Sequence, residues 1–379
     1  MRTAAADRVL ILGSRGVPAS HGGFETLAEQ LSLHLVARGW RVTVYCQQEG
    51  RGSIRTDEWR GVERVLIPVT ASGAIGTVLF DWRATLHAAR QAGTALVLGY
   101  NTAAFVPFLR AAGKRVIINM DGIEWQRDKW SKAARGWLRV NERIGAAVAH
   151  ALIADHPEIA LHLQTFTSDA KITTIPYGAF AIDSAPVGHV ESLGLAPKRY
   201  MLVVARLEPE NSVAEIVRAY SARSRPYGLA VVGPVDAETN TYHRALLAAA
   251  GNSVRFLGPI YDQESLAALR FHALAHLHGH TVGGTNPSLV EAMGAHNAII
   301  AHDNRFNRWV AGESAVYFSG EADLRSALDR LDASDEPLEG MRRGSRARFE
   351  KCFTWPQILS EYESLLTRTR TREAVTRDG

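Results

Sequence analysis

One segment of the chain has the residue types of a phosphate-binding loop. The residues "HGHTVGGTNPSLVEAM" (278–293) lie between a short apolar run, typical of a buried strand, and a segment with helical spacing. Gly283, Gly284 and Thr285 leave the main chain accessible just before the helical segment begins. The first N–H groups of a helix have no partner within it, and the helix dipole favours negative charge there. The pattern therefore predicts that these N–H groups bind phosphate oxygens.

Polar side chains follow these glycines. Asn286 or Ser288 can cap the helix or donate a hydrogen bond to an anion, and Pro287 suits a first helical turn. Glu291 lies about one turn further on, where its carboxylate can accept two hydrogen bonds from the vicinal hydroxyls of a ribose. The alternative for Glu291 is a solvated residue that the helix dipole favours. A phosphate loop beside a ribose carboxylate would form a nucleotide-sugar site.

A second glycine-rich segment, "GSRGVPASHGGFE" (13–25), follows the first apolar run. Gly22 and Gly23 stand where a helix begins, and without side chains they let main-chain N–H groups approach an anion. A tight turn that needs glycine is the alternative. The glycine spacing does not match G-x-G-x-x-G, and the second apolar run ends in "YCQ" rather than in an acidic residue. A nicotinamide-dinucleotide site is therefore disfavoured.

The sequence contains few candidate ligands for a metal ion. His278 and His280 are two residues apart with no third ligand nearby, and no D-x-D sequence stands at a strand end. Hydrogen bonding of these histidines to a sugar or a phosphate is the favoured interpretation, with core packing as the alternative for one of them. Cys46 and Cys352 are too few for a disulfide framework or a metal cluster. We therefore expect no metal and no cofactor other than a co-substrate.

Alternating strands and helices position these segments. Seven short apolar runs lie between "RVLILGS" (8–14) and "KITTIPYG" (171–178), and six more follow between 200 and 319, with helical patterns between most of them. Near-continuous apolar strands that alternate with helices indicate parallel sheets covered on both faces. At 379 residues the chain is long enough for two such α/β domains. Doubly wound sheets bind ligands at the carboxyl ends of their strands, where the glycine segments stand.

The domain boundary falls near residues 178–198, which have weak periodicity and two prolines and which we interpret as a linker. We expect a first Rossmann-like domain at 1–180 and a second at 181–366. The last helix, about 355–366, is expected to pack back on the first domain, and residues 367–379 to form a disordered tail.

Composition excludes several functional classes. The chain is 46% hydrophobic and 22% charged, as in globular proteins, and no apolar run reaches the roughly 18–20 residues of a membrane span. The N-terminus has no cleavable signal pattern, so we expect a cytoplasmic location. A formal net charge of +4 is too weak to indicate nucleic-acid binding, and it suits anionic small molecules or a membrane surface.

The segment "RDKWSKAARGWLRVNER" (127–143) has six basic and two acidic residues, with Trp130, Trp137 and Leu138 among them. A basic helix that carries tryptophan suits an anionic membrane, where lipid-linked acceptors reside. The alternative is a solvated helix face whose tryptophans pack inward. The membrane interpretation predicts peripheral association at the inner face of the plasma membrane.

These segments carry a resemblance to a known family. "ILGSRGVPASHGGFETLAEQL", "NMDGIEWQRDKW", "VARLEPENS" and "HGHTVGGTNPSLVEAM" resemble family 4 glycosyltransferases, and more narrowly the bacterial rhamnosyltransferases of capsule and cell-wall synthesis. The resemblance extends from about residue 9 to about residue 366. It implies the GT-B fold, in which two Rossmann-like domains face each other across a cleft. The acceptor would bind mainly the N-terminal domain and the donor nucleotide the C-terminal domain.

The resemblance also implies roles for individual residues. Glu291 corresponds to the second glutamate of the family's E-x7-E motif, which holds the ribose, and Arg206 matches the basic residue that neutralises the diphosphate. The first glutamate of the motif falls at Gly283 and the usual lysine at Asn211, so main-chain N–H groups, Arg206 and helix dipoles must stabilise the leaving diphosphate. Asp121 stands where many relatives have a histidine, and it would hydrogen-bond a sugar hydroxyl or accept the acceptor's proton.

Three sets of site residues follow from the resemblance and the loop patterns. The expected catalytic residues are Asp121, Arg206 and Glu291. The expected donor contacts are Gly22, Gly23, Arg206, Asn211, His280, Gly283, Gly284, Thr285, Asn286, Ser288, Leu289 and Glu291. The expected acceptor contacts are Glu25, Asp121, Glu124 and Trp125, and for Trp125 sugar stacking and core packing are alternatives.

The implied reaction is transfer of a sugar with retention of anomeric configuration, by front-face attack in which the leaving phosphate helps to deprotonate the acceptor. The departures from the family motifs favour dTDP-β-L-rhamnose as the donor. The acceptor would be a saccharide, lipid-linked, in the synthesis of a cell-surface polysaccharide or glycolipid. The alternatives are a transferase that uses a UDP- or GDP-sugar, a sugar-nucleotide epimerase or hydrolase, and a non-catalytic sugar-nucleotide binder.

Overall fold

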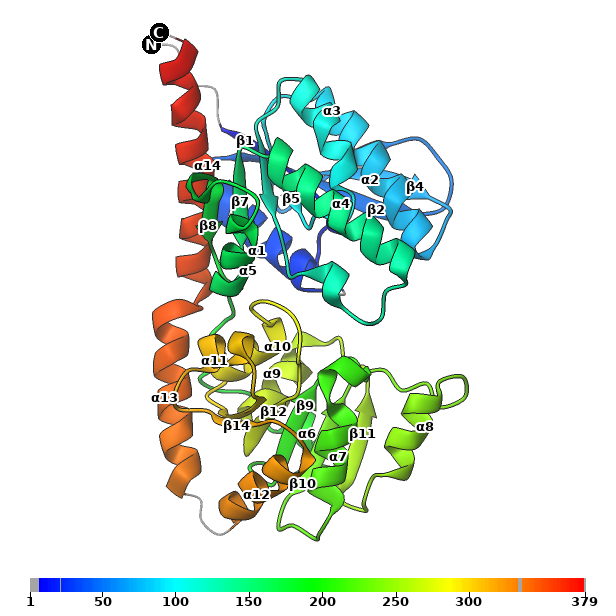
Figure 1. The fold of residues 1–379 in the computed structure, drawn as a ribbon, viewed down its shortest axis with the longest axis vertical. Coiled ribbons are helices and arrows are strands. Elements are labelled where there is room, and N and C mark those ends of the chain that lie inside the picture. The colour runs from blue at the N-terminus through cyan, green and yellow to red at the C-terminus, as the bar shows by residue number, and fades with distance from the viewer. Residues whose placement is uncertain (1–6, 21, 333–335, 378–379) are drawn as a thin grey trace. The chain divides into compact units, whose positions relative to one another are not determined.

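The computed structural model describes residues 7–20, 22–332 and 336–377, and the chain forms two compact units (Figure 1). The first unit contains the chain up to Pro176 and the residues from Pro356 onward, and the second unit extends from Tyr177 to Trp355. The chain therefore leaves the first unit once and returns to it at its C-terminal end. The sequence predicts the domain boundary at residue 180, whereas the structure places it after Pro176.

In the described residues the first unit has an eight-stranded sheet in the order β3-β4-β2-β1-β5-β6-β7-β8, in which only β3 and β4 pair antiparallel. The chain runs from β1 towards one edge and restarts at β5 towards the other, so the strand order reverses between β1 and β5. Ligands bind doubly wound sheets at such a reversal. The strands are β1 (Arg8–Leu12), β2 (Arg41–Glu49), β3 (Arg55–Trp59), β4 (Val62–Val69), β5 (Thr94–Leu98), β6 (Val116–Asn119), β7 (Ala151–Ala154) and β8 (Ile172–Thr174).

Helices pack on this sheet and bury its apolar strands. Val9, Leu10 and Ile11 of β1 are completely buried, as a strand covered on both faces requires. Figure 1 shows α2, α3 and α4 side by side against one side of the sheet. The helices are α1 (Gly23–Ala37), α2 (Gly73–Ala89), α3 (Val106–Ala111), α4 (Lys132–Val148), α5 (Pro157–Gln164) and α14 (Trp355–Arg377), with short 3-10 helices η1 (Ala103–Phe105), η2 (Glu124–Gln126) and η3 (Asp169–Lys171).

Strand β3 has no counterpart among the apolar runs of the sequence. Its residues "RTDEW" are mostly exposed, and it pairs with β4 at the edge of the sheet. An edge strand gains from charged side chains, because they oppose pairing with another chain. The apolar continuity that marks the inner strands is therefore missing from β3.

The second unit has, within the described residues, a six-stranded sheet in the order β11-β10-β9-β12-β13-β14, with all neighbours parallel. Its strand order reverses between β9 and β12. The strands are β9 (Tyr200–Val204), β10 (Gly228–Val232), β11 (Val254–Gly258), β12 (Ala275–His278), β13 (Ala298–His302) and β14 (Val316–Phe318). The helices are α6 (Gly188–Ser192), η4 (Pro209–Asn211), α7 (Val213–Ser221), α8 (Thr241–Ala248), α9 (Gln263–Phe271), α10 (Pro287–Gly294), α11 (Arg305–Ala311), α12 (Glu321–Asp332) and α13 (Glu336–Cys352).

Residues 178–198 are part of the second unit, so their interpretation as a linker is wrong. The N–H of Ala179 donates to the carbonyl oxygen of Phe353 at 2.9 Å, and the N–H of Ile182 donates to that of Gly294 at 2.9 Å. Val190 of α6 is completely buried and packs in an apolar cluster with residues of α9. Too few apolar residues anchor this segment to produce a periodic pattern.

Helix α14 belongs to the first unit almost from its start. Its Tyr362 Oη accepts a hydrogen bond from Asn119 Nδ2 at 2.7 Å, and its Glu363 Oε2 lies 2.9 Å from His34 Nε2. The helix continues to Arg377 and so extends into the segment 367–379, for which the sequence predicts a disordered tail. Residues 378 and 379 lie outside the described residues. Once packed turns have nucleated a helix, each further residue adds a hydrogen bond, which favours its continuation.

Candidate functional site

Two loops meet at the carboxyl edge of the second sheet, where its strand order reverses. The main-chain N–H and the Oγ1 of Thr281, after β12, both donate to the carbonyl oxygen of Glu210 in η4, at 2.9 Å each. A Cβ on Gly279 would lie 2.2 Å from the carbonyl oxygen of Asn211, so only glycine permits this approach. The loops after β9 and β12 are therefore held together where a doubly wound sheet binds its ligand.

Arg206 lies in the first of these loops. Its side chain is 54% exposed, and its Nη1 is 3.5 Å from Glu208 Oε1. An exposed ion pair of this kind contributes about 0–1 kcal/mol, so the guanidinium can exchange Glu208 for a phosphate at little cost. The position of Arg206 at the sheet edge is compatible with the expected contact to a diphosphate.

Asn211 supports the loop that carries Arg206. Its surface is 1% exposed, and its Nδ2 donates to the carbonyl oxygen of Arg206 at 2.8 Å. Its Oδ1 is buried without a hydrogen-bond partner among the described residues, and the expected donor contact of Asn211 stays a prediction. A buried lysine at this position would leave an ammonium group out of water, whereas the neutral amide costs far less to bury.

The glycine loop leads directly into α10. Gly283 has a φ of +130°, which residues with a side chain rarely adopt, and Gly284 and the buried Thr285 follow it. The side chain of Asn286 makes no capping hydrogen bond to α10, and its Oδ1 accepts a bond from Ser288 Oγ at 3.4 Å. The N-terminus of α10 therefore has no cap from Asn286, which is compatible with the expected binding of an anion.

Leu289 belongs to the core. It is completely buried in an apolar cluster that also contains Val310 and Phe349. Its N–H donates to the carbonyl oxygen of Asn286 at 3.1 Å. Neither its side chain nor its N–H is available to a donor, so the donor contact expected for Leu289 is wrong. Helical periodicity turns this residue to the inward face of α10.

Glu291 is held by an arginine of the preceding helix. Arg270 Nη2 of α9 donates to Glu291 Oε2 at 2.5 Å, and the two side chains are 6% and 28% exposed. Glu291 Oε1 has no hydrogen-bond partner among the described residues. The alternative of a freely solvated Glu291 does not hold, because the carboxylate is fixed through one oxygen while the other can accept a bond from a ligand.

Three histidines form a stack that begins in β12. The ring centroids of His276 and His278 are 6.0 Å apart, and those of His278 and His280 are 4.3 Å apart. His276 and His278 are 0% and 1% exposed, and their ring nitrogens have no hydrogen-bond partner among the described residues. Burial lowers the pKa of His276 to about 3 and that of His278 well below its ordinary value, so both rings are neutral at pH 7. For His278 the core alternative holds, and only the half-buried His280 remains a donor candidate.

The histidine stack does not form a metal site. Its rings lie nearly parallel, with 29° and 7° between their planes, so their nitrogens do not converge on one point. Across residues 7–20, 22–332 and 336–377 no group of three His, Cys, Asp or Glu residues could hold a metal ion.

A pocket of about 260 Å³ opens beside the carboxyl end of β1, one of the two strands between which the strand order of the first sheet reverses. Gly13 has a φ of +84°, and a Cβ there would lie 2.2 Å from the carbonyl oxygen of Leu98, so this turn requires glycine. Gly22 differs, because its backbone is extended and a Cβ there would meet nothing within 4 Å. The pocket is lined by Gly13, Ser14, Arg15, Gly22, Gly23, Phe24, Glu25, Gln47, Thr77, Phe80 and Asp81.

The glycines at the start of α1 line this pocket. Gly22 precedes α1 and provides no side-chain cap, and Gly23 is the first helical residue. The extended backbone of Gly22 does not require glycine, so a tight turn does not account for it, and its place at the pocket is compatible with the expected anion contact. Glu25, in the first turn, is 6% exposed and also lines the pocket, which is compatible with the expected acceptor contact.

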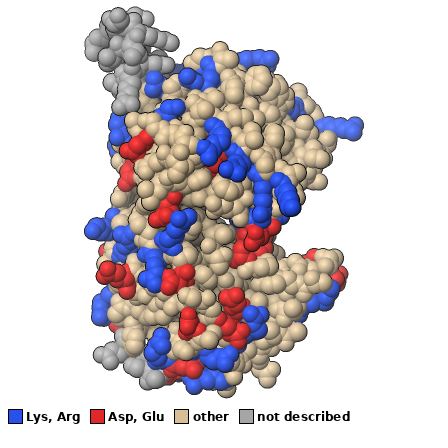
Figure 2. Space-filling model, viewed as in Figure 1, with Lys and Arg blue, Asp and Glu red and all other residues tan. Residues whose placement is uncertain are grey.

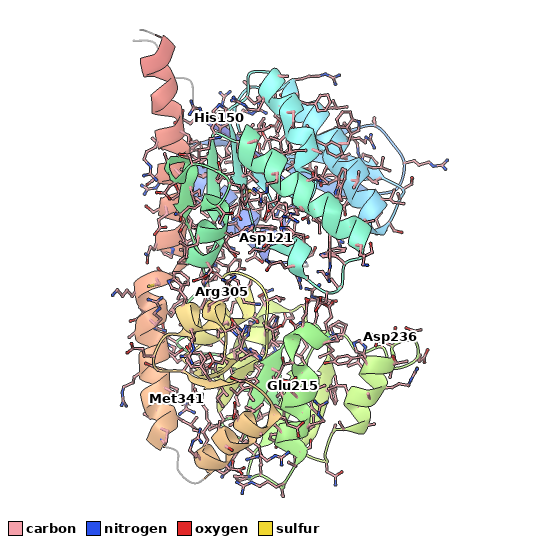
Figure 3. All side chains as sticks on the ribbon, viewed as in Figure 1. Asp121, His150, Glu215, Asp236, Arg305 and Met341 are labelled. Atoms are coloured by element: carbon pink, nitrogen blue, oxygen red, sulfur yellow. The ribbon has the colours of Figure 1, made fainter. Side chains whose placement is uncertain are left out.

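Asp121 follows β6 at the carboxyl edge of the first sheet (Figure 3). Its φ is +51°, and its N–H donates to Asn119 Oδ1 at 2.9 Å, while Asn119 Nδ2 binds Tyr362 of α14. Burial, and then the carboxylate of Glu124, raise the pKa of Asp121 to about 6. A carboxylate whose pKa lies near neutrality is suited to accept a proton.

Glu124 holds its own loop together. Its Oε1 accepts from Arg127 Nη1 at 2.8 Å, and its Oε2 accepts from Trp130 Nε1 at 3.4 Å. The residue is 8% exposed. Both oxygens already accept a hydrogen bond within the protein, so the structure assigns Glu124 a role in holding this loop, and its expected acceptor contact stays a prediction.

Trp125 packs against the protein. Its Nε1 donates to Glu142 Oε2 at 3.1 Å, and the guanidinium of Arg139 lies over its ring, 5.2 Å from the centroid. Trp125 is half-buried, so these contacts fix its ring without placing it in the core, and sugar stacking and packing stay alternatives.

The structure brings several expected site residues together and adds others. Arg206, the glycine loop and Glu291 lie at neighbouring strands of one edge in the second unit, and Asp121 and Glu25 lie at the carboxyl edge of the first sheet. Sequence reasoning missed three polar residues, Ser14, Asp81 and Arg270. Ser14 lies two residues after β1, which was a usable signal, but the other two lie inside helices where nothing local marks them.

The two doubly wound sheets define the GT-B fold, the fold of a class of glycosyltransferases. Over 97% of this chain and all of the other, the structure is similar to a sucrose-phosphate synthase from Thermosynechococcus elongatus, with a TM-score of 0.79 and 17% identity. It is similar to an α,α-trehalose 6-phosphate synthase from Burkholderia multivorans over 99% of both chains, with a TM-score of 0.77 and 12% identity. HepE of Anabaena, in complex with UDP and glucose, matches 96% of this chain and all of its own, with a TM-score of 0.74 and 14% identity.

Residues 6–180 match the model of a family described as "Domain of unknown function (DUF1972)". No curated protein sequence matches the chain. The family match covers most of the first unit, and at such low identities the structural likeness establishes the fold alone. Among the helices of the described residues, none is both long and apolar enough to cross a membrane.

Proposed function

We propose that the protein is a retaining glycosyltransferase that moves a sugar from a nucleoside-diphosphate donor to a saccharide acceptor. The observation that carries this proposal is the joined pair of loops after β9 and β12. They set Arg206, the open N-terminus of α10 and the Glu291 carboxylate at neighbouring strands of one sheet edge. A guanidinium and main-chain N–H groups suit a diphosphate, and a fixed carboxylate suits ribose hydroxyls. A nucleoside diphosphate uses all three groups.

In the proposed reaction the bond between the sugar C1 and the diphosphate oxygen breaks while a bond from C1 to an acceptor oxygen forms on the same face. The acceptor's proton passes to the leaving phosphate or to Asp121, whose pKa of about 6 allows it to accept. Arg206 and the N–H groups at the start of α10 stabilise the charge on the leaving diphosphate. The products are a nucleoside diphosphate and a glycoside of retained configuration.

The donor that we propose is dTDP-β-L-rhamnose, because Gly283 and Asn211 replace the acidic and basic residues that most of the resembled family carries. A UDP-sugar is the first alternative, and the complex of HepE with UDP favours it. An epimerase or hydrolase on this fold would consume the donor without an acceptor. A non-catalytic binder would bind the donor and form no product.

The test is incubation of the purified full-length protein with dTDP-rhamnose, UDP-glucose and GDP-mannose in turn. Each donor is combined with glucose- and N-acetylglucosamine-diphosphate-lipid analogues, and products are followed by mass spectrometry. We expect an acceptor mass increased by one rhamnose. Transfer of another sugar with dTDP-rhamnose inert would overturn the donor, and donor turnover without glycoside would overturn the transferase.

We further propose that α4 rests on an anionic membrane, where a lipid-linked acceptor would reside. Trp137 and Val140 on this helix are 44% and 55% exposed, and Phe108 on the neighbouring α3 is 48% exposed. Figure 2 shows Lys and Arg side chains gathered over α4. Exposed apolar side chains beside basic ones suit an interfacial helix. The inward-packing alternative holds for Leu138, which is 4% exposed, but not for Trp137.

Vesicle sedimentation tests this surface, with phosphatidylcholine vesicles that either lack or contain phosphatidylglycerol. Lys132 and Arg139 are exposed on α4, and each basic residue near an anionic surface contributes about 1 kcal/mol. The double variant Lys132→Gln, Arg139→Gln should therefore bind anionic vesicles about 30-fold more weakly. Arg343→Gln, at a 73% exposed arginine of α13, is the matched control. Equal binding to neutral vesicles, or no effect of the double variant, would contradict the membrane role.

A further inference from the structure

The pocket of the first unit contains two buried polar side chains that the proposed reaction does not use. Ser14 follows β1 and Asp81 lies in α2, and they are 7% and 9% exposed. Both line the pocket of about 260 Å³ beside the carboxyl end of β1. The small exposed part of each side chain therefore faces this pocket.

Asp81 is a carboxyl group with most of its hydrogen-bonding capacity unused. Thr102 Oγ1 donates to Asp81 Oδ2 at 2.8 Å, and no other described residue binds the carboxyl group or forms an ion pair with it. A carboxylate can accept about four hydrogen bonds. Burying such a group without partners is costly, so further donors are expected from whatever enters the pocket.

Ser14 gives a second, independent indication. Its Oγ is shielded from solvent and has no hydrogen-bond partner among the described residues. An unsatisfied buried hydroxyl costs about 1–3 kcal/mol. Because Ser14 lines the pocket, rotation of its side chain would bring the hydroxyl to a ligand there.

The size and lining of the pocket select a small ligand rich in hydroxyl groups. Ligand cavities usually measure about 300–1,000 Å³, so a pocket of about 260 Å³ suits a single sugar ring rather than an oligosaccharide. Thr77 and Gln47 add a hydroxyl and an amide, and Phe80 adds an apolar surface. Saccharides need this combination, because their rings have polar edges and apolar faces.

We infer that this pocket binds a monosaccharide unit of the acceptor, and that Asp81 and Ser14 recognise its hydroxyl groups. The inference rests on the proposed transferase function and assigns acceptor specificity to α2 and the loop after β1. A sugar hydroxyl that donates to Asp81 Oδ1 fills its unused capacity, and a second hydroxyl satisfies Ser14 Oγ.

The ionisation of Asp81 gives this site a distinct pH dependence. Burial raises the pKa of Asp81 to about 6. Hydroxyl donors bind the ionised carboxylate, so the affinity for saccharide should fall as the pH falls through about 6. Arg15 and Glu25 are the other charged residues that line the pocket, so only the difference between the wild type and an Asp81 variant isolates this contribution.

The experiment compares the full-length wild type with Asp81→Asn and Ser14→Ala. The KM for the glucose- and N-acetylglucosamine-diphosphate-lipid analogues is measured with the donor that supports transfer, beside the Kd for UDP and dTDP. Asp81→Asn should raise the acceptor KM at least tenfold and Ser14→Ala about fivefold, with nucleotide Kd unchanged. Asp169→Asn, at an exposed carboxylate in η3, is the control and should change neither value.

Ligand-observed NMR with free glucose and N-acetylglucosamine separates failure of this inference from failure of the transferase proposal. Saccharide binding that weakens below pH 6 in the wild type, and that Asp81→Asn abolishes at every pH, supports the pocket even if no donor supports transfer. Normal transfer with an unchanged acceptor KM in Asp81→Asn and Ser14→Ala overturns the pocket and leaves the transferase intact. Absence of saccharide binding to an inactive wild type overturns both.

Discussion

Replacing Glu291 by alanine should destabilise the second unit as well as remove a ligand contact. Arg270 Nη2 lies 2.5 Å from Glu291 Oε2, and the arginine side chain is only 6% exposed. Removing one partner of a buried ion pair costs about 3–5 kcal/mol, because the remaining charge stays buried and unpaired. Glu291 is 28% exposed, so water can partly replace it, and the lower end, about 3 kcal/mol, applies.

Two further variants separate the structural contribution from ligand binding. Glu291→Gln keeps a carbonyl oxygen that can accept from Arg270, so we expect a loss of only about 1–2 kcal/mol. Arg270→Met combined with Glu291→Ala removes both charges, and it should recover most of the stability. If Glu291 holds the ribose, this double variant still binds nucleotide at least tenfold more weakly than the wild type does.

Urea unfolding followed by circular dichroism measures the free energy of unfolding, and isothermal titration calorimetry measures the Kd for UDP and dTDP. A Glu291→Ala protein within about 0.5 kcal/mol of the wild type would refute the dependence of Arg270 on this carboxylate. Wild-type nucleotide affinity in the double variant would refute the role of Glu291 in the ligand site. The two conclusions can thus fail separately.

Three further predictions concern burial and backbone geometry. Asp81→Asn should be more stable than the wild type at pH 8 by up to about 3 kcal/mol, because the raised pKa of Asp81 makes its ionised form unfavourable in the folded state. At pH 3 the two proteins should be equally stable, and thermal melting at the two pH values checks this. His276 and His278 are neutral in the folded protein but protonated in the unfolded chain below pH 6.5. The free energy of unfolding should therefore fall between pH 6 and 4 by up to about 2.7 kcal/mol per pH unit, and His276→Leu should halve that slope in urea unfolding. Gly13→Ala should lower the free energy of unfolding by about 3 kcal/mol, whereas Gly22→Ala should stay within about 0.5 kcal/mol of the wild type. A reversed order in urea unfolding would contradict the geometry of the first glycine loop.

Apolar continuity made most of the architecture predictable. Strands such as β1, with completely buried inner residues, stand out from the polar loops on either side, and both parallel sheets follow from them. The edge strand β3 lacks that contrast because its charged side chains face solvent. The linker prediction for residues 178–198 failed for a related reason, since a few long-range hydrogen bonds and one buried valine anchor this segment without any periodic pattern.

In the candidate site, too, the features that the sequence predicts are local, and those that it does not predict depend on long-range contacts. The open N-terminus of α10 and the glycines before it are local features, and the sequence predicts them. The burial of Leu289 and Asn211 depends on what packs over them, which the spacing of the loop residues does not reveal. The pairing of Arg270 with Glu291 joins two helices on either side of β12, and no motif marks it.

Synthesis on the ribosome imposes an order on this architecture. The second unit is one continuous stretch, so it can fold as soon as its last residue has left the exit tunnel, whereas the first unit still lacks α14 at that moment. Tyr362 of that helix supports Asn119, which in turn binds the main chain of Asp121. The loop that bears the proposed proton acceptor therefore reaches its final support only after translation has passed the last helix.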